Sequence, residues 1–119
     1  TDPTLAQQAI ANILKNALDY TPRGGQIILT TKGQVAAGQH WVTITVADTG
    51  PGISAEDRPH IFERFYRGAA ARDYTVPGTG LGLAISQDIV HKLGGHITLD
   101  SEPELGAVFT VWLPVAPQP

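Results

Sequence analysis

Residues 40–48, HWVTITVAD, carry the pattern that most restricts the fold of this chain. Apolar residues such as Val42 and Ile44 alternate with threonine and tryptophan, which is the period of a strand with one buried face. Residues 26–32 predict a second strand, and we expect residues 33–39 to form the turn between the two. The pattern therefore predicts a β-hairpin.

Two longer segments have helical periodicity. Asp2 is a candidate N-cap, Pro3 fits the first turn, and apolar residues three and four apart continue to about Tyr20. A second apolar stripe covers residues 81–93 and ends at two glycines. Residues 54–65, which begin with a serine cap, fit one or two short helices.

The C-terminal part predicts a second strand pair, HITLDS at 96–101 and AVFTVWLP at 107–114. Residues 66–78 have no periodicity, which at that length is typical of a lid or a disordered loop. The elements follow in the order helix, two strands, short helices, irregular segment, helix, two strands. This order predicts an α+β domain whose mostly antiparallel sheet is covered on one face.

Composition limits the class of function. With 119 residues, 42% of them hydrophobic, the chain suits one domain, 1–119, with a tail at 115–119. The net charge of −3 and eight dispersed basic residues argue against nucleic-acid binding. There is no cysteine, the histidines lack metal-ligand spacing, and no apolar run could span a membrane, so we expect no direct membrane contact. The helix-like start and the PVAPQP end lead us to expect a piece of a longer protein.

Two asparagines stand beside the apolar stripe of the first helix. Asn12 and Asn16 are four residues apart and therefore share one helix face. Their amides could bond to neighbouring backbone, as buried amides usually do. The alternative is a nucleotide site in which the amide oxygen of Asn16 is a hard, neutral ligand for Mg²⁺.

Asp48 ends the second strand and is followed by Gly50 and Gly52. This is either an ordinary strand exit or a site for a flat base. In the second case the carboxylate accepts a hydrogen bond from an exocyclic amine, which selects adenine over guanine.

The segment VPGTGLGLAIS, residues 76–86, places Gly78, Gly80 and Gly82 just before a helical run. Glycines let a ligand approach backbone amides closely, so a phosphate group is the first candidate. No Gly-Lys-Ser/Thr follows, and no buried strand precedes, so neither a Walker loop nor a dinucleotide fingerprint fits.

Together these motifs resemble the catalytic ATP-binding domain of sensor histidine kinases. That family shares its nucleotide fold with gyrase, ninety-kilodalton heat-shock chaperones and mismatch-repair ATPases, and the resemblance runs from Asp2 to Pro114. It implies an α/β sandwich in which a mixed, largely antiparallel sheet backs about three helices and a mobile lid at about 66–78 closes over ATP. The motifs are Asn12-x-x-x-Asn16, Asp48-x-Gly50-x-Gly52-Ile53, IFERFYR at 61–67, and Gly78-Thr79-Gly80-Leu81-Gly82-Leu83.

The resemblance also implies roles by position. Asn16 matches the Mg²⁺ ligand, and Asn12 matches its neighbour at the phosphates. The residues implied to contact ATP are Asn16, Tyr20, Asp48, Gly50, Gly52, Ile53, Gly78, Thr79, Gly80, Leu81, Gly82 and Leu83.

The IFERFYR motif is implied to lie at the base of the lid. Arg67 matches an arginine that reaches the γ-phosphate, where a planar guanidinium stabilises the charge of the transferring group. A solvated lid edge is the alternative for Arg64 and Arg67. We expect Phe62 and Phe65 to pack at the base of the lid rather than touch the ligand.

The chain departs from the family pattern in three places. Asp19 stands where a basic residue is common, which removes one cationic phosphate contact. The later glycine box keeps Gly106 and Phe109 but has Glu104 and Ala107 where glycine and threonine are common. No histidine has a phosphoacceptor context, so the nucleophile is expected outside this chain.

The resemblance implies a protein-histidine kinase. The sister ATPases have a water-activating glutamate at the place of Asn12, whose amide cannot take a proton, so rapid hydrolysis is disfavoured. We expect a histidine of a separate dimerisation and phosphoacceptor domain to attack Mg²⁺-ATP, with later transfer to an aspartate of a response regulator. Alternatives are a degenerate nucleotide-responsive binding module and a serine-directed kinase. The isolated chain is expected to be monomeric and cytoplasmic, and an inner-membrane anchor in the parent is left open.

Overall fold

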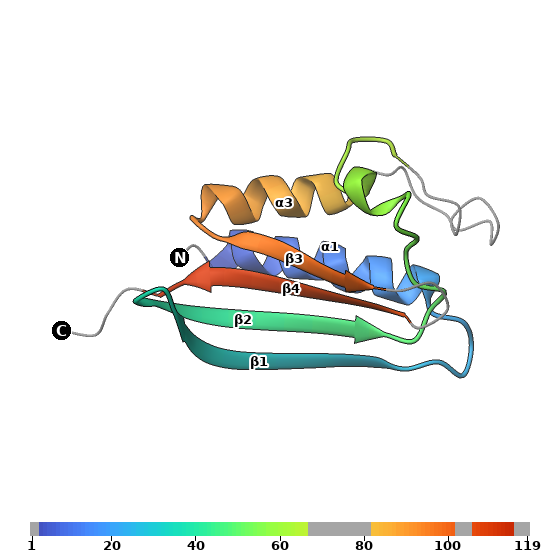
Figure 1. Cartoon of the computed structure of the whole chain (residues 1–119), viewed down its shortest axis with the longest axis horizontal. Coiled ribbons are helices and arrows are strands. Elements are labelled where there is room, and N and C mark those ends of the chain that lie inside the picture. The colour runs from blue at the N-terminus through green and yellow to red at the C-terminus, as the bar shows by residue number, and fades with distance from the viewer. Residues whose placement is uncertain (1–2, 67–81, 102–105, 116–119) are drawn as a thin grey trace.

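The computed structural model describes residues 3–66, 82–101 and 106–115. Four strands form one sheet in the order β1-β2-β4-β3, and every neighbouring pair is antiparallel. Figure 1 shows α1 and α3 on the same side of this sheet, running in opposite directions. The elements are α1 Pro3–Tyr20, β1 Ile27–Ala36, β2 Gln39–Asp48, the 3-10 helix η1 Arg58–His60, α3 Gly82–Lys92, β3 His96–Ser101 and β4 Ala107–Pro114.

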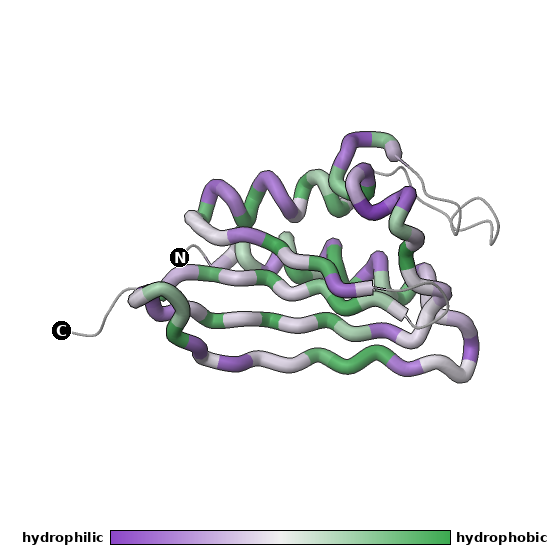
Figure 2. The backbone as a smooth tube through the Cα atoms, in the orientation of Figure 1, coloured by the Kyte–Doolittle hydropathy of each residue, from purple (hydrophilic) through white to green (hydrophobic). Residues whose placement is uncertain are grey.

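The core lies between the helices and the central strands. Along β4 buried and half-buried residues alternate, so that Phe109 and Val111 face the helices with 1% of their surface exposed. Figure 2 shows a similar alternation of hydropathy along β2, β3 and most of β4, whereas β1 has a continuous hydrophobic stretch. Burying one large apolar side chain contributes roughly 1.5 to 3 kcal/mol, so this layer dominates stability. The core residues are Ala9, Ile13, Ala17, Ile44, Val46, Ile89, Val90, Ala107, Phe109, Val111 and Leu113.

The α+β prediction is confirmed, with differences in detail. The described strands contain no parallel pair, and the described residues hold two α-helices and one 3-10 helix. The expected turn at 33–39 was wrong, because the strands continue and only Ala37 and Gly38, both with positive φ, remain between them. Residues 54–65 contain one short helix, η1, with turns on both sides, in agreement with the prediction of one or two short helices.

None of the helices in the described part of the chain is both long and apolar enough to cross a membrane.

Candidate functional site

Three predicted site segments meet at one end of the molecule. Tyr20 is the last residue of α1, Asp48 the last residue of β2, and Gly82 the first residue of α3. In Figure 1 these three element ends all lie at the end of the sheet opposite the β1–β2 turn. The chain direction produces this arrangement, because α1 and β2 run toward this end of the sheet and α3 runs away from it.

Asp48 is buried on the side of the sheet that the helices cover. It continues the buried face of Ile44 and Val46, and only 8% of its surface is exposed. Its Oδ1 accepts a hydrogen bond of 2.8 Å from the backbone N–H of Gly50. Burial raises the pKa of the Asp48 carboxyl, and backbone hydrogen bonds from Gly50 and Ala107 oppose part of that rise. A buried carboxylate of this kind favours a ligand that brings a hydrogen-bond donor.

The glycine after Asp48 lies against α1. A Cβ atom at Gly50 would be 2.8 Å from the carbonyl oxygen of Tyr20 and 3.0 Å from Asp48 Oδ1. Any side chain there would push the loop away from the helix. The structure therefore brings together Tyr20, Asp48 and Gly50, which the family resemblance implies for one site.

The loop that follows, residues 49–53, is held at both ends. The backbone N–H of Thr49 donates to the Gln26 carbonyl at 3.1 Å, and Thr49 Oγ1 accepts from the Gln26 N–H at 2.9 Å. At the other end the Ile53 N–H donates to Ser101 Oγ at 2.8 Å. Between these ends, Gly52 has a φ of 75° and is half-buried.

The sequence analysis did not identify the contact between Ser101 and the loop at Ile53. The only signal available was a serine at the end of a half-apolar strand, which is as typical of an exposed turn as of a buried contact.

Asn12 and Asn16 lie on α1 two turns and one turn before Tyr20. Both are half-buried, and neither side-chain amide makes a hydrogen bond within the described residues. The bonding to neighbouring backbone that we considered above is therefore not found for these two amides. An unused amide oxygen at this place fits a hard cation such as Mg²⁺. The described residues include no cluster of three or more histidine, cysteine or acidic side chains that could hold a metal ion, so such an ion would depend on ligand oxygens as well.

Asp19, the departure from the family pattern, is paired on its own helix. Lys15 Nζ lies 2.8 Å from Asp19 Oδ2, and the Lys15 side chain is 67% exposed. The lysine therefore offsets much of the negative charge that Asp19 adds beside Asn16 and Tyr20.

The beginning of α3 is fixed against α1. Ser86 is completely buried, and its hydroxyl donates to the Ala9 carbonyl at 2.8 Å. Leu83 is half-buried and packs against the core, whereas Gly82 is exposed at the helix N-terminus. Because the two helices run in opposite directions, this N-terminus lies on the side of the C-terminal half of α1. Predicted residues that lie outside the described residues are Arg67, Gly78, Thr79, Gly80 and Leu81.

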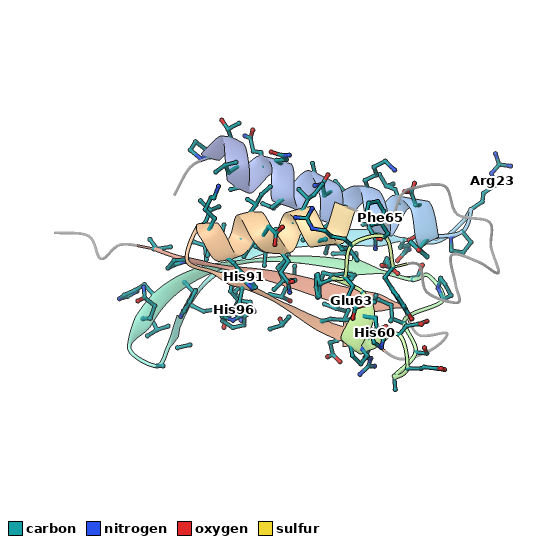
Figure 3. All side chains as sticks on the ribbon, turned by 90° about the horizontal axis from the view of Figure 1, so that it is seen from above. Arg23, His60, Glu63, Phe65, His91 and His96 are labelled. Carbon is teal, nitrogen blue, oxygen red and sulfur yellow. The ribbon has the colours of Figure 1, made fainter. Side chains whose placement is uncertain are left out.

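The two phenylalanines of the IFERFYR motif behave differently. Phe62 packs edge-on against Phe109 with 6.4 Å between the ring centroids, as expected for a packing residue. The expectation for Phe65 was wrong, because it is 69% exposed with a φ of 66° (Figure 3). The positive φ turns its side chain away from the core that Phe62 enters.

Arg64 is exposed and donates to Asp88 of α3 at 3.1 Å. This contact agrees with the solvated-edge interpretation of Arg64. It also links the segment after η1 to α3.

Comparison with known proteins gives one family. The family model described as Histidine kinase-, DNA gyrase B-, and HSP90-like ATPase matches residues 1–117. The sensor histidine kinase Hik2 of Synechocystis sp. is 42% identical over 116 residues, which cover 90% of this chain and 26% of Hik2. The sensor protein IrlS of Burkholderia pseudomallei is 44% identical over 112 residues, which cover 94% of this chain and 23% of IrlS. This chain thus spans about a quarter of the length of these relatives.

Solved structures agree with this result. The mycobacterial sensor histidine kinase MprB is similar with a TM-score of 0.82 and 33% identity over 99% of this chain and 77% of that one. Full-length ShkA in complex with AMPPNP has a TM-score of 0.77 and 33% identity over 95% of this chain and 22% of that one. The fold predicted from the sequence is the fold of these catalytic domains.

Proposed function

Because this chain belongs to the histidine kinase-, DNA gyrase B- and HSP90-like ATPase family, we propose that it is the part of a sensor histidine kinase that binds Mg²⁺-ATP. In this proposal it donates the γ-phosphate to a histidine of a separate dimerisation and phosphoacceptor domain. The observation that carries the proposal is the buried Asp48 carboxylate beside Gly50, whose backbone touches the end of α1. This arrangement suits recognition of adenine.

Asp48 is the adenine-reading residue in this proposal. Its carboxylate accepts a hydrogen bond from the exocyclic amine of the base, and a hydrogen bond to a charged group is worth about 1.5 to 3 kcal/mol. Guanine would present a carbonyl oxygen at the same place, where it faces the carboxylate lone pairs. Gly50 and Gly52 leave the space next to the base without side chains.

The phosphates lie between α1 and the start of α3 in this proposal. The first N–H groups of an α-helix have no partner within the helix, so the N-terminus of α3, which begins at Gly82, favours an anion. Asn16 supplies an amide oxygen to Mg²⁺, and Asn12 contacts the phosphates one turn earlier. When bound, Mg²⁺ neutralises phosphate charge and orients the phosphate oxygens.

Phosphoryl transfer to histidine needs no general base in this chain. A neutral imidazole is already nucleophilic, so the protein has only to position it in line with the γ-phosphate and stabilise the charge. A new N–P bond forms, the bond between the γ-phosphorus and the bridging oxygen breaks, and ADP leaves. The relatives are about four times longer than this chain, which leaves room for an acceptor domain. A response-regulator aspartate then takes the phosphate on the cytoplasmic side.

A single-turnover phosphotransfer assay with the complete parent protein tests this proposal. Acid-labile, base-stable phosphohistidine that forms from Mg²⁺-ATP is the expected result. ATP binding without any phosphohistidine would favour the nucleotide-responsive module, for which the Lys15–Asp19 pair at the phosphate side is the supporting observation. Acid-stable phosphoserine on a partner protein would favour the serine-directed kinase.

A further inference from the structure

Ser101 joins two buried backbone groups next to the proposed adenine site. It is the last residue of β3 and only 4% of its surface is exposed. Its Oγ accepts a hydrogen bond of 2.8 Å from the Ile53 N–H and donates one of 2.9 Å to the Gly106 carbonyl. One hydroxyl therefore connects the loop after β2 to the residue just before β4.

The Gly106 end of this connection is packed against Asp48 itself. A Cβ atom at Gly106 would lie 2.0 Å from the Asp48 carbonyl oxygen, and Asp48 pairs with Ala107 in the sheet. Gly106 has a φ of 87°, a conformation that glycine adopts readily. The Ser101 hydroxyl thus connects Ile53 to a backbone position that packs directly against Asp48.

The opposite end of the loop has its own attachment through Thr49 and Gln26. Between the two attachments, the Gly50 N–H donates directly to Asp48 Oδ1, and Gly52, with a φ of 75°, lies beyond that bond. The position of the part from Gly52 to Ile53 relative to the Asp48 carboxylate therefore depends on how the Ile53 end is held.

We propose that Ser101 is a positioning residue for adenine recognition, which fixes the loop 49–53 relative to the carboxylate of Asp48. This inference rests on the proposed function, since it concerns the nucleotide site. Ser101 acts through Ile53 and touches no ligand. Removing its hydroxyl leaves the Ile53 N–H and the Gly106 carbonyl without this partner. The loop can then move away from the position in which it lies flat against the adenine base.

Ser101→Ala tests the inference, with Thr43→Val as the matched control. Thr43 is also a buried residue whose hydroxyl donates to a backbone carbonyl, but its partner is Lys32 on β1, in the middle of the β1–β2 pair. Calorimetry with Mg²⁺ measures the Kd for ADP and for inosine diphosphate, which carries a carbonyl in place of the amine. We expect both variants to lose thermal stability, and only Ser101→Ala to lose affinity for ADP, by about ten-fold, with a smaller ADP preference.

Amide hydrogen exchange provides a second readout, because the Ile53 N–H should exchange faster in Ser101→Ala and at the wild-type rate in Thr43→Val. If Ser101→Ala does not fold, Ser101→Cys, a weaker hydrogen-bonding group, should show an intermediate loss of the ADP preference. Faster exchange at Ile53 with an unchanged ADP preference would overturn the inference. A wild-type protein that binds no ADP would instead contradict the proposed function.

Discussion

The backbone of Gly50 lies so close to the carbonyl group of Tyr20 that a Cβ atom at Gly50 would be 2.8 Å from that oxygen. This contact fixes the loop after β2 against the end of α1. Asn16 is one helical turn before Tyr20, so its distance from Asp48 depends on the same contact. The backbone contact between Gly50 and Tyr20 therefore determines how the base half of the proposed nucleotide site lies relative to the phosphate half.

Gly50→Ala should disturb both halves of the site. The added methyl group meets the Tyr20 carbonyl and Asp48 Oδ1, and relief of that overlap moves the loop. We expect a loss of roughly 1 to 3 kcal/mol in the free energy of unfolding and at least ten-fold weaker ADP binding. Gly33→Ala is the control, because a Cβ atom at Gly33 meets nothing within 4 Å. Equal ADP affinity of the two variants in calorimetry would contradict this role of Gly50.

The parts of the fold with strong periodicity could be predicted from the sequence. The apolar stripe that ends at Tyr20 correctly predicted α1, and the strand pattern of residues 107–114 correctly predicted β4 and its bounds. Both predictions succeed because an element that buries one face leaves a regular pattern in the sequence. Asp48 and Gly50 could be assigned to one site only through the family resemblance. Their individual patterns also fitted an ordinary strand exit.

Asp48→Asn should weaken adenine binding while leaving the loop in place. The amide oxygen of asparagine can still accept from the Gly50 N–H, but the charged hydrogen bond to the base is lost. We expect a ten- to hundred-fold higher Kd for ADP, on the order of 1.5 to 3 kcal/mol. Asp100→Asn, at an exposed carboxylate on β3, is the control. Near-wild-type affinity of Asp48→Asn in calorimetry would remove the adenine-reading assignment.

The stability of the free protein should depend on pH through Asp48. Burial raises the pKa of its carboxyl above the usual 3.8, so the folded protein holds this proton more tightly than the unfolded chain does. The charged form therefore costs stability at neutral pH, and the cost fades as the pH falls from above the raised pKa toward 3.8. We expect wild type to gain stability relative to Asp48→Asn in urea unfolding as the pH falls from neutral toward 3.8. A constant difference between the two proteins would contradict this expectation.

Local geometry without periodicity could not be predicted. The turn at Ala37 and Gly38 is shorter than expected because strand pairing continues through residues 33–36, where the sequence has no alternation of apolar and polar residues. Phe65 looked like a second packing residue, and its backbone conformation instead directs it to solvent. Ser101 has a partner 48 residues away, a distance at which no sequence pattern in one chain identifies the contact.

Asn16→Ala should make ADP binding nearly insensitive to Mg²⁺. In wild type we expect tighter binding with Mg²⁺ than with a chelator, because the amide oxygen of Asn16 contributes one of the few protein ligands that Mg²⁺ takes. The variant should lose about ten-fold in affinity with Mg²⁺ and little with the chelator. Gln8→Ala, at an exposed position on α1, serves as the control. An equal loss under both conditions would mean that Asn16 contacts the nucleotide rather than the ion.

Asp19 and Lys15 should affect nucleotide affinity in opposite directions. Asp19 places a negative charge beside the proposed phosphate side, and the ion pair of 2.8 Å with Lys15 offsets it. Asp19→Asn should therefore tighten ADP binding by about five-fold at low salt, and Lys15→Gln should weaken it by a similar factor, since a charge interaction near the surface is worth about 1 kcal/mol. Both effects should shrink as salt is added, because these side chains are partly exposed. Titrations of ADP at two salt concentrations test this. A change of Kd in the same direction in both variants would show that the ion pair acts by stabilising α1 rather than through its charge at the phosphates.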